Sequence, residues 1–208
     1  GDVTQLFDYS TIAKSRPIIE NNKNTILINL NKVRHFSFVK DPIPFEKKKN
    51  QLVFRGKIVG KENRTRFMNM YWGNPICDIG HPKSHTNEHP EWLVSEMTIR
   101  EHLDFKFILS LEGNDVASNL KWVMSSNSIA VMPKPKYETW YMEGTLIPDF
   151  HYIEIKDDFS NLEEKLKYYI EHTDEALRII KNAHDYVSQF QDKKREKLIS
   201  LLATKPFS

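Results

Sequence analysis

The sequence lacks several features that would assign it to a class at once. Its 208 residues include a single cysteine, Cys77, which cannot form a disulfide within the chain and fits a reducing compartment. No apolar run approaches the ~20 residues of a membrane-spanning helix, and the N-terminus shows no signal-peptide pattern. We therefore expect a soluble chain.

The sequence also lacks an excess of charge of either sign. It has 30 Lys and Arg residues against 28 Asp and Glu residues, spread along the chain, and a formal net charge of +2. A general nucleic-acid surface needs concentrated positive charge, so we expect no nucleic-acid partner. Neither an internal repeat nor a low-complexity linker is present, and the length suffices to bury a sizeable core.

What the sequence does contain is one stretch typical of a βαβ unit. The short apolar run at 107–111 predicts a buried strand, and a second run at 129–132 predicts another. Between them, Val116, Leu120 and Val123 fall on one helical stripe, which predicts a helix over 116–124. Two strands joined by one helix are most simply parallel, so the fold is expected to be α/β.

The turn between this first strand and the helix is a candidate anion site. Backbone N–H groups at such a turn are free, and Gly113 permits close approach to them. Ser118 and Lys121 lie near enough to add donors to a phosphate. The alternative is that Gly113 only turns the chain while Asn114 or Asp115 caps the helix. Asp115 opposes a phosphate there unless a cation compensates it.

A second candidate ligand-binding position lies at the end of another predicted strand, Leu52–Phe54. Arg55 would place its guanidinium at a strand's carboxyl end, where α/β sheets usually bind ligands. Gly56 directly after it suggests a backbone that something approaches closely. A helix is expected to begin near Arg64, so Arg64 and Arg66 either gather with Arg55 at one mouth or form a solvated helix start.

Residues 73–98 are expected to form a long connection, and such loops are often functional. Three histidines spaced by four, His81, His85 and His89, could bind zinc if they shared a helix face. Pro82 and the Pro/Ser/Asn-rich composition disfavour a helix here, so no metal site is expected.

The remaining predicted elements are short strands and a helical C-terminal part. They are strands at 26–30 and 151–155, a short helix capped by Thr98 and ending near Phe105, a helix opened by a capping box at Ser160–Glu163, and helices at 174–190 and 193–202.

Several separate motifs occur together in the order seen in glycosyltransferase family 90. They are Arg34-His-Phe36, Phe54-Arg-Gly56, Glu112 to Ser118 with Lys121, Ser126-Asn-Ser128, and Trp140 through Gly144, Leu146 and Pro148 to His151-Tyr152. From Gly1 to about His184, the chain resembles this family of capsule-associated, lipopolysaccharide and protein O-glucosyltransferases, and in particular its bacterial lipopolysaccharide branch.

The resemblance implies an α/β, Rossmann-like parallel sheet flanked by helices, corresponding mainly to the C-terminal, donor-binding half of a GT-B fold. Residues 1–50 would be a remnant or linker of the N-terminal acceptor half, and 51–208 the nucleotide-sugar-binding domain with C-terminal helices. It also implies transfer of a hexose or pentose from a UDP-sugar to a glycan or lipopolysaccharide-type acceptor, with inversion and without a metal or other cofactor.

The resemblance also assigns roles to individual residues. Arg55 with Gly56 would hold the donor diphosphate, Glu112, Gly113 and Ser118 would form the nucleotide-binding loop, Lys121 would be a basic position after it, and Asp2 would be the general base. The protein O-glucosyltransferase branch carries an arginine where this chain has Asn119. Neutralisation of the diphosphate would then rest more heavily on Arg55, with Arg66 or Lys121 as helpers.

Family members have a further N-terminal stretch before the Gly1-Asp2 motif. A non-catalytic nucleotide-sugar-binding or interaction module that has lost its acceptor half is therefore the alternative function. The expected location is the cytoplasm. We leave open whether a missing segment attaches the protein peripherally to the inner face of a membrane.

Overall fold

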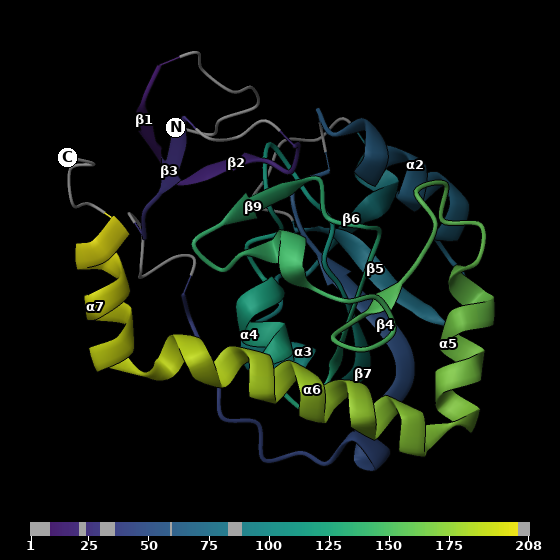
Figure 1. The fold of residues 1–208 in the computed structure, drawn as a ribbon. Coiled ribbons are helices and arrows are strands. Elements are labelled where there is room, and N and C mark those ends of the chain that lie inside the picture. The colour runs from purple at the N-terminus through teal and green to yellow at the C-terminus, as the bar shows by residue number, and fades with distance from the viewer. Residues whose placement is uncertain (1–8, 21–23, 30–35, 59, 83–88, 204–208) are drawn as a thin grey trace.

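The computed structural model describes residues 9–20, 24–29, 36–58, 60–82 and 89–203. At its centre lies a six-stranded sheet whose neighbouring strands all pair in parallel (Figure 1). Its strands, in chain order, are β4 (Lys49–Arg55), β5 (Cys77–Pro82), β6 (Leu93–Val94), β7 (Phe105–Leu109), β8 (Ile129–Met132) and β10 (Ile153–Glu154). The expected α/β class, a Rossmann-like parallel sheet flanked by helices, is confirmed.

The strands follow the spatial order β6-β5-β4-β7-β8-β10. Counted from one in chain order, this is 3-2-1-4-5-6, the doubly wound order. The chain winds outward in one direction from β4 to β6 and in the other from β7 to β10. Ligands of such sheets bind beyond the carboxyl ends of the two central strands, where the winding reverses. In this chain those ends are Arg55 and Leu109.

Both faces of the sheet are covered, so its central strands are apolar throughout. All five residues of β7 are buried, as a central parallel strand requires. Along β4, Leu52 and Phe54 belong to one core cluster and Val53 to the other, because successive side chains point to opposite faces.

The helices divide between these two faces. They are α2 (Glu62–Tyr71), α3 (Ile99–His102), α4 (Leu120–Met124), α5 (Leu162–Glu171), α6 (Thr173–Gln191) and α7 (Lys193–Ala203). α2 and α5 pack on the face that contains Leu52, and α4 packs on the face that contains Val53. α6 contributes Ile179 to the first core and Val187 to the second. In Figure 1 it crosses the lower half of the view from α5 to α7.

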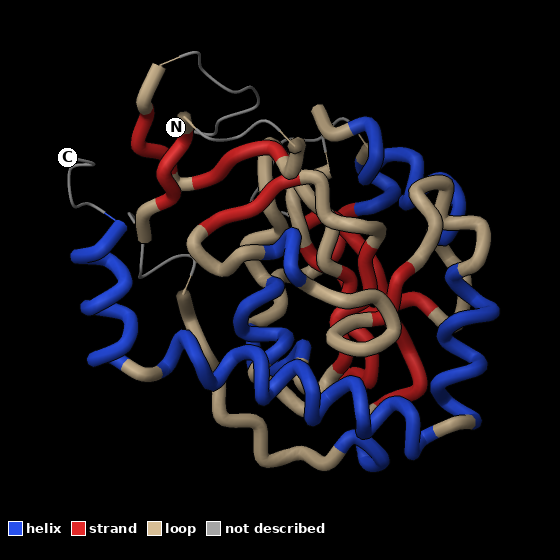
Figure 2. The backbone as a smooth tube through the Cα atoms, in the orientation of Figure 1, coloured by secondary structure: helices blue, strands red, loops and turns tan. Residues whose placement is uncertain are grey.

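Two short strand pairs lie outside the main sheet, and both involve the N-terminal segment (Figure 2). β1 (Thr11–Ala13) pairs in parallel with β3 (Thr25–Leu27), while β2 (Ser15–Pro17) pairs antiparallel with β9 (Tyr137–Thr139). Arg16 reinforces the second pair, donating from Nε to Glu138 Oε1 at 2.9 Å. The segment that precedes β4 is therefore joined to the chain that follows β8.

The predicted βαβ unit is present with two changes. β7 and β8 are parallel neighbours as expected, but β7 begins at Phe105 rather than at residue 107. The helix expected from Val116 begins only at Leu120. Asp115 does not cap a helix, because its carboxylate instead accepts a hydrogen bond from Ser15 Oγ of β2 at 2.8 Å. Residues 110–119 consequently form a loop.

The two predicted helix caps have opposite outcomes. Thr98 does cap α3: its Oγ1 accepts from Glu101 N at 3.3 Å, and the Glu101 carboxylate accepts from Thr98 N at 2.6 Å. The capping box at Ser160 is wrong, because Ser160 Oγ donates to Asp158 at 2.8 Å and α5 begins at Leu162.

The other predicted helices and strands are found, with shifted ends, except that residues 73–98 also contain β5 and β6. Within the described part of the chain, no helix combines the length and apolar character needed to cross a bilayer. The division of the chain at residue 50 stays a prediction.

We predict that Leu166→Ala lowers the free energy of unfolding by about 2–5 kcal/mol, because Leu166 is fully buried between α5 and the sheet. Leu198→Ala on α7, where the leucine is 59% exposed, is the matched control and should change stability by less than about 0.5 kcal/mol. Urea denaturation measures both. Equal effects of the two substitutions would contradict the packing of α5 described above.

Candidate functional site

A cavity of about 540 Å³ opens where the winding of the sheet reverses. Arg55 and Gly56 line it from the end of β4, and Gly113 and Ser118 line it from the loop after β7. Arg55 and the Gly113 turn therefore lie on the same side of the sheet, as a shared ligand site requires. This is the place where doubly wound sheets bind their ligands.

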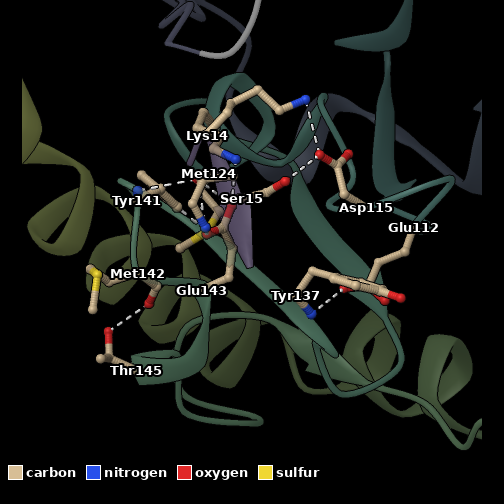
Figure 3. A network of polar contacts seen from close by, with 12 residues as sticks. Lys14, Ser15, Glu112, Asp115, Met124, Tyr137, Tyr141, Met142, Glu143 and Thr145 are labelled. Atoms are coloured by element: carbon tan, nitrogen blue, oxygen red, sulfur yellow. Dashed lines mark hydrogen bonds and ion pairs between the residues drawn. The ribbon is translucent and has the colours of Figure 1, made fainter. Parts of the chain in front are cut away.

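The cavity is strongly basic. Five lining residues carry positive charge, and one, Asp115, carries negative charge: the basic residues are Lys14, Arg55, Lys57, Lys61 and Arg64. Asp115 is itself neutralised, since Lys14 Nζ lies 2.9 Å from its carboxylate (Figure 3). Lys14 is the cation that a phosphate near Asp115 would need. A site with this charge balance favours a multiply charged anion.

Arg55 is held in place by its neighbour on β5. Its Nη2 donates to Asp78 Oδ1 at 2.5 Å, and its Nη1 donates to the Asp78 carbonyl at 2.8 Å. The side chain is only 9% exposed. Gly56 is required by close packing, because a Cβ there would lie 2.8 Å from the ring of Phe54. The group that closely approaches Gly56 is therefore the Phe54 side chain of the protein itself.

The loops after β4 and β7 are connected by basic side chains. Arg64 donates from Nη1 to Lys57 O at 2.8 Å and from Nη2 to Leu111 O at 2.7 Å. Lys61 Nζ donates to Asn114 Oδ1. Two of the residues that supply the cavity's charge therefore also fix the distance between its walls.

The predicted site residues separate into four groups. Arg55, Gly56, Gly113 and Ser118 line the basic cavity. Arg66 and Glu112 line a neighbouring recess of about 60 Å³, which shares Leu111 and Val116 with the cavity. Lys121 lines neither, and Asp2 lies outside the described residues. Arg64 lines the same basic cavity as Arg55, but Arg66 does not.

Glu112 ties two loops together beside the recess. Its Oε1 accepts the backbone N–H of Lys136 at 3.0 Å and of Tyr137 at 3.1 Å (Figure 3). Burial raises the pKa of this carboxyl to about 7, although both hydrogen bonds act in the opposite direction.

Lys121 forms a buried ion pair with Glu143, and both side chains are 1% exposed. Glu143 also accepts the backbone N–H of Thr139 at 2.6 Å and its hydroxyl at 2.9 Å. The Lys121 ammonium lies 5.2 Å from the centre of the Tyr141 ring. Because Lys121 is fully engaged inside the protein, its prediction as a diphosphate contact needs correction: it holds the chain after β9.

Of the three histidines considered as zinc ligands, the two that the structure describes do not lie on a helix. His81 is buried in β5, with Nδ1 3.2 Å from the Gly56 carbonyl oxygen. His89 stacks on Trp92 at 3.9 Å between ring centres, and His85 lies outside the described residues.

A doubly wound parallel sheet with a basic cavity at its reversal point is typical of α/β proteins that bind nucleotides and other phosphorylated ligands. The sequence model of Glycosyl transferase family 90 matches residues 24–195. This chain belongs to glycosyltransferase family 90.

Two relatives are similar to this chain. O-glucosyltransferase LpsA of Dichelobacter nodosus is 43% identical over 210 residues, which cover 100% of this chain and 64% of the relative. Protein O-glucosyltransferase 3 of Rattus norvegicus is 29% identical over 139 residues, which cover 64% of this chain and 27% of the relative. The chain thus spans less than two thirds of the length of either relative.

We predict that Lys121→Met lowers the free energy of unfolding by about 3–5 kcal/mol, because it leaves the Glu143 carboxylate buried without its cation. Lys181→Met is the control: Lys181 pairs with Asp185 on the exposed surface of α6, where such pairs contribute about 0–1 kcal/mol. Chemical denaturation of both variants measures the two changes in the free energy of unfolding. A Lys121→Met protein of normal stability would show that the pair is not buried as described.

We also predict that Glu112 makes stability depend on pH. Its pKa is about 7 in the folded chain and about 4.3 in an unfolded one, so between these values the folded state binds more protons. Stability contributed by Glu112 therefore falls as pH rises from about 4.5 to about 7. The melting temperature of Glu112→Gln relative to the unsubstituted protein should rise across this range. A constant difference would argue against the buried carboxyl; Glu164→Gln on α5 is the exposed control.

Proposed function

We propose that this chain is the donor-binding part of a glycosyltransferase that uses a UDP-sugar. The supporting observation is the convergence of Arg55 and the Gly113 loop on one basic cavity, in a member of glycosyltransferase family 90. The donor's diphosphate would lie in this cavity, and its nucleoside would extend toward the recess lined by Glu112 and Arg66.

The chemistry of the cavity suits a transfer that needs no metal. An acceptor hydroxyl oxygen attacks the anomeric carbon from the side opposite the leaving group, its proton passes to a carboxylate, and UDP departs with inversion at that carbon. Positive charge must stabilise the departing diphosphate, and Arg55 with the neighbouring basic residues would supply it. Asp2 stays the predicted general base.

The transferred sugar and its acceptor are further parts of the proposal. Both relatives are named O-glucosyltransferases, so UDP-glucose is the first donor to test. We propose a glycan or lipopolysaccharide-type acceptor and a cytoplasmic location, from the motif resemblance alone.

A non-catalytic nucleotide-sugar-binding module is the second candidate. It accounts for the same basic cavity, because holding a donor diphosphate needs Arg55 and the Gly113 loop but no general base. Release of UDP from UDP-glucose by the purified chain, with glucose passed to an acceptor or to water, would exclude the module. Tight binding of UDP-glucose without release of UDP would favour it.

We predict that Arg55→Ala weakens UDP binding about thirtyfold, since loss of a charged hydrogen bond at a buried site costs about 2 kcal/mol. Asp78 loses its partner in this variant but is 38% exposed and can be hydrated. Arg178→Ala, on the exposed surface of α6, is the control. Isothermal titration calorimetry measures all three proteins. Unchanged affinity in Arg55→Ala would remove the main support for the donor site.

A further inference from the structure

His102 is a titratable side chain of the cavity that the sequence did not indicate. It is the last residue of α3, is 8% exposed, and lines the cavity together with Arg55 and Gly113. Its ring packs edge-on against Trp122 of α4, with 5.7 Å between the ring centres and an angle of 76°. The ring therefore contacts a second helix besides the one that carries it.

The hydrogen bonding of His102 defines which nitrogen carries the proton. Nδ1 lies 2.8 Å from the carbonyl oxygen of Thr98, and a carbonyl oxygen only accepts, so Nδ1 donates. In a neutral imidazole the other nitrogen, Nε2, is then an acceptor. Among the residues that the structure describes, none hydrogen-bonds Nε2. The imidazole is anchored by one edge and offers a lone pair at the other.

The charges around His102 favour its neutral form. Burial is the largest cause that lowers the pKa of the imidazole, and the charge of Arg55 on β4 lowers it further. The bond to Thr98 O and the carboxylates of Glu101 on α3 and Asp78 on β5 act in the opposite direction without reversing the shift. Trp122, which packs against the ring from α4, is uncharged.

The position of His102 relative to Arg55 suggests which part of a bound donor would lie beside Nε2. If Arg55 holds the donor diphosphate, the sugar attached to its terminal phosphate lies in the same cavity, beside the wall that His102 and Trp122 form. Sugars present hydroxyl groups, and an acceptor on the cavity wall that no described protein group occupies is well suited to bind one.

We infer, on the basis of the proposed function, that His102 is a donor-sugar-binding residue whose Nε2 accepts a hydrogen bond from a hydroxyl of the transferred sugar. This hydroxyl belongs to the sugar and is missing from UDP. His102 therefore contributes to the affinity for UDP-glucose and not to the affinity for UDP.

Two substitutions separate this role from a structural one. In His102→Asn the shorter amide can still donate to Thr98 O but offers no acceptor at the position of Nε2. In His102→Gln the longer amide places an oxygen near the position of Nε2 and gives up the bond to Thr98. We expect His102→Asn to bind UDP-glucose about tenfold more weakly, with UDP affinity unchanged, while His102→Gln retains most of the UDP-glucose affinity.

Calorimetric titration with UDP and with UDP-glucose gives distinct outcomes. Equal weakening of both ligands in His102→Asn, or greater loss in His102→Gln than in His102→Asn, would overturn the inference and leave the proposed function intact. Failure of the unsubstituted chain to bind UDP would instead contradict the proposed function.

A second measurement keeps the inference testable if His102→Asn does not fold. The UDP-glucose affinity of the unsubstituted chain should fall as pH is lowered and the imidazole gains a proton at Nε2. This component of the pH dependence should be missing in His102→Gln, whereas the titration of Glu112 remains in both proteins. Identical pH profiles for the two proteins would overturn the inference.

Discussion

The parallel pairing of β4 with β7 is the constraint on which the cavity depends. Leu52 lies opposite Phe107 and Val53 opposite Ile108, so the two strands end at the same edge of the sheet. Side chains of one strand alternate between two buried cores, and a shift of one residue would turn Arg55 toward the opposite face. The apolar packing of both faces thus fixes where the guanidinium stands. The position of this positive charge in the cavity therefore depends on hydrophobic burial on the two faces of the sheet.

The part of the fold that the sequence predicts is the part with simple patterns. Short apolar runs indicated β7 and β8, and their parallel pairing followed from the predicted helix between them. β5 escaped prediction because its residues Cys77–Pro82 include a glycine, a histidine and a proline, and the long polar stretch after it resembles a loop. Gly80 is nonetheless required there, since a Cβ would lie 2.4 Å from Val94 of β6. Such close contacts between strands leave no periodic signal in the sequence.

The position of a candidate site residue was predictable where it follows from the end of a strand. Arg55 and Gly113 are of this kind. Lys14 could not be found, because it reaches the cavity only through the pairing of β2 with β9, more than a hundred residues along the chain. Lys121 shows the converse error. A lysine on a predicted helix is normally solvated, and only the tertiary structure reveals that Glu143 takes its charge inside the core.

The central claim is that one anion-binding site joins the end of β4 to the loop after β7. The most direct test is a crystal structure of this chain with UDP bound. The account predicts that the diphosphate lies in the basic cavity, within hydrogen-bond distance of Arg55 and of the backbone or hydroxyl groups at 113–118. A diphosphate bound elsewhere, with Arg55 still hydrogen-bonded to Asp78 and not to the ligand, would contradict it.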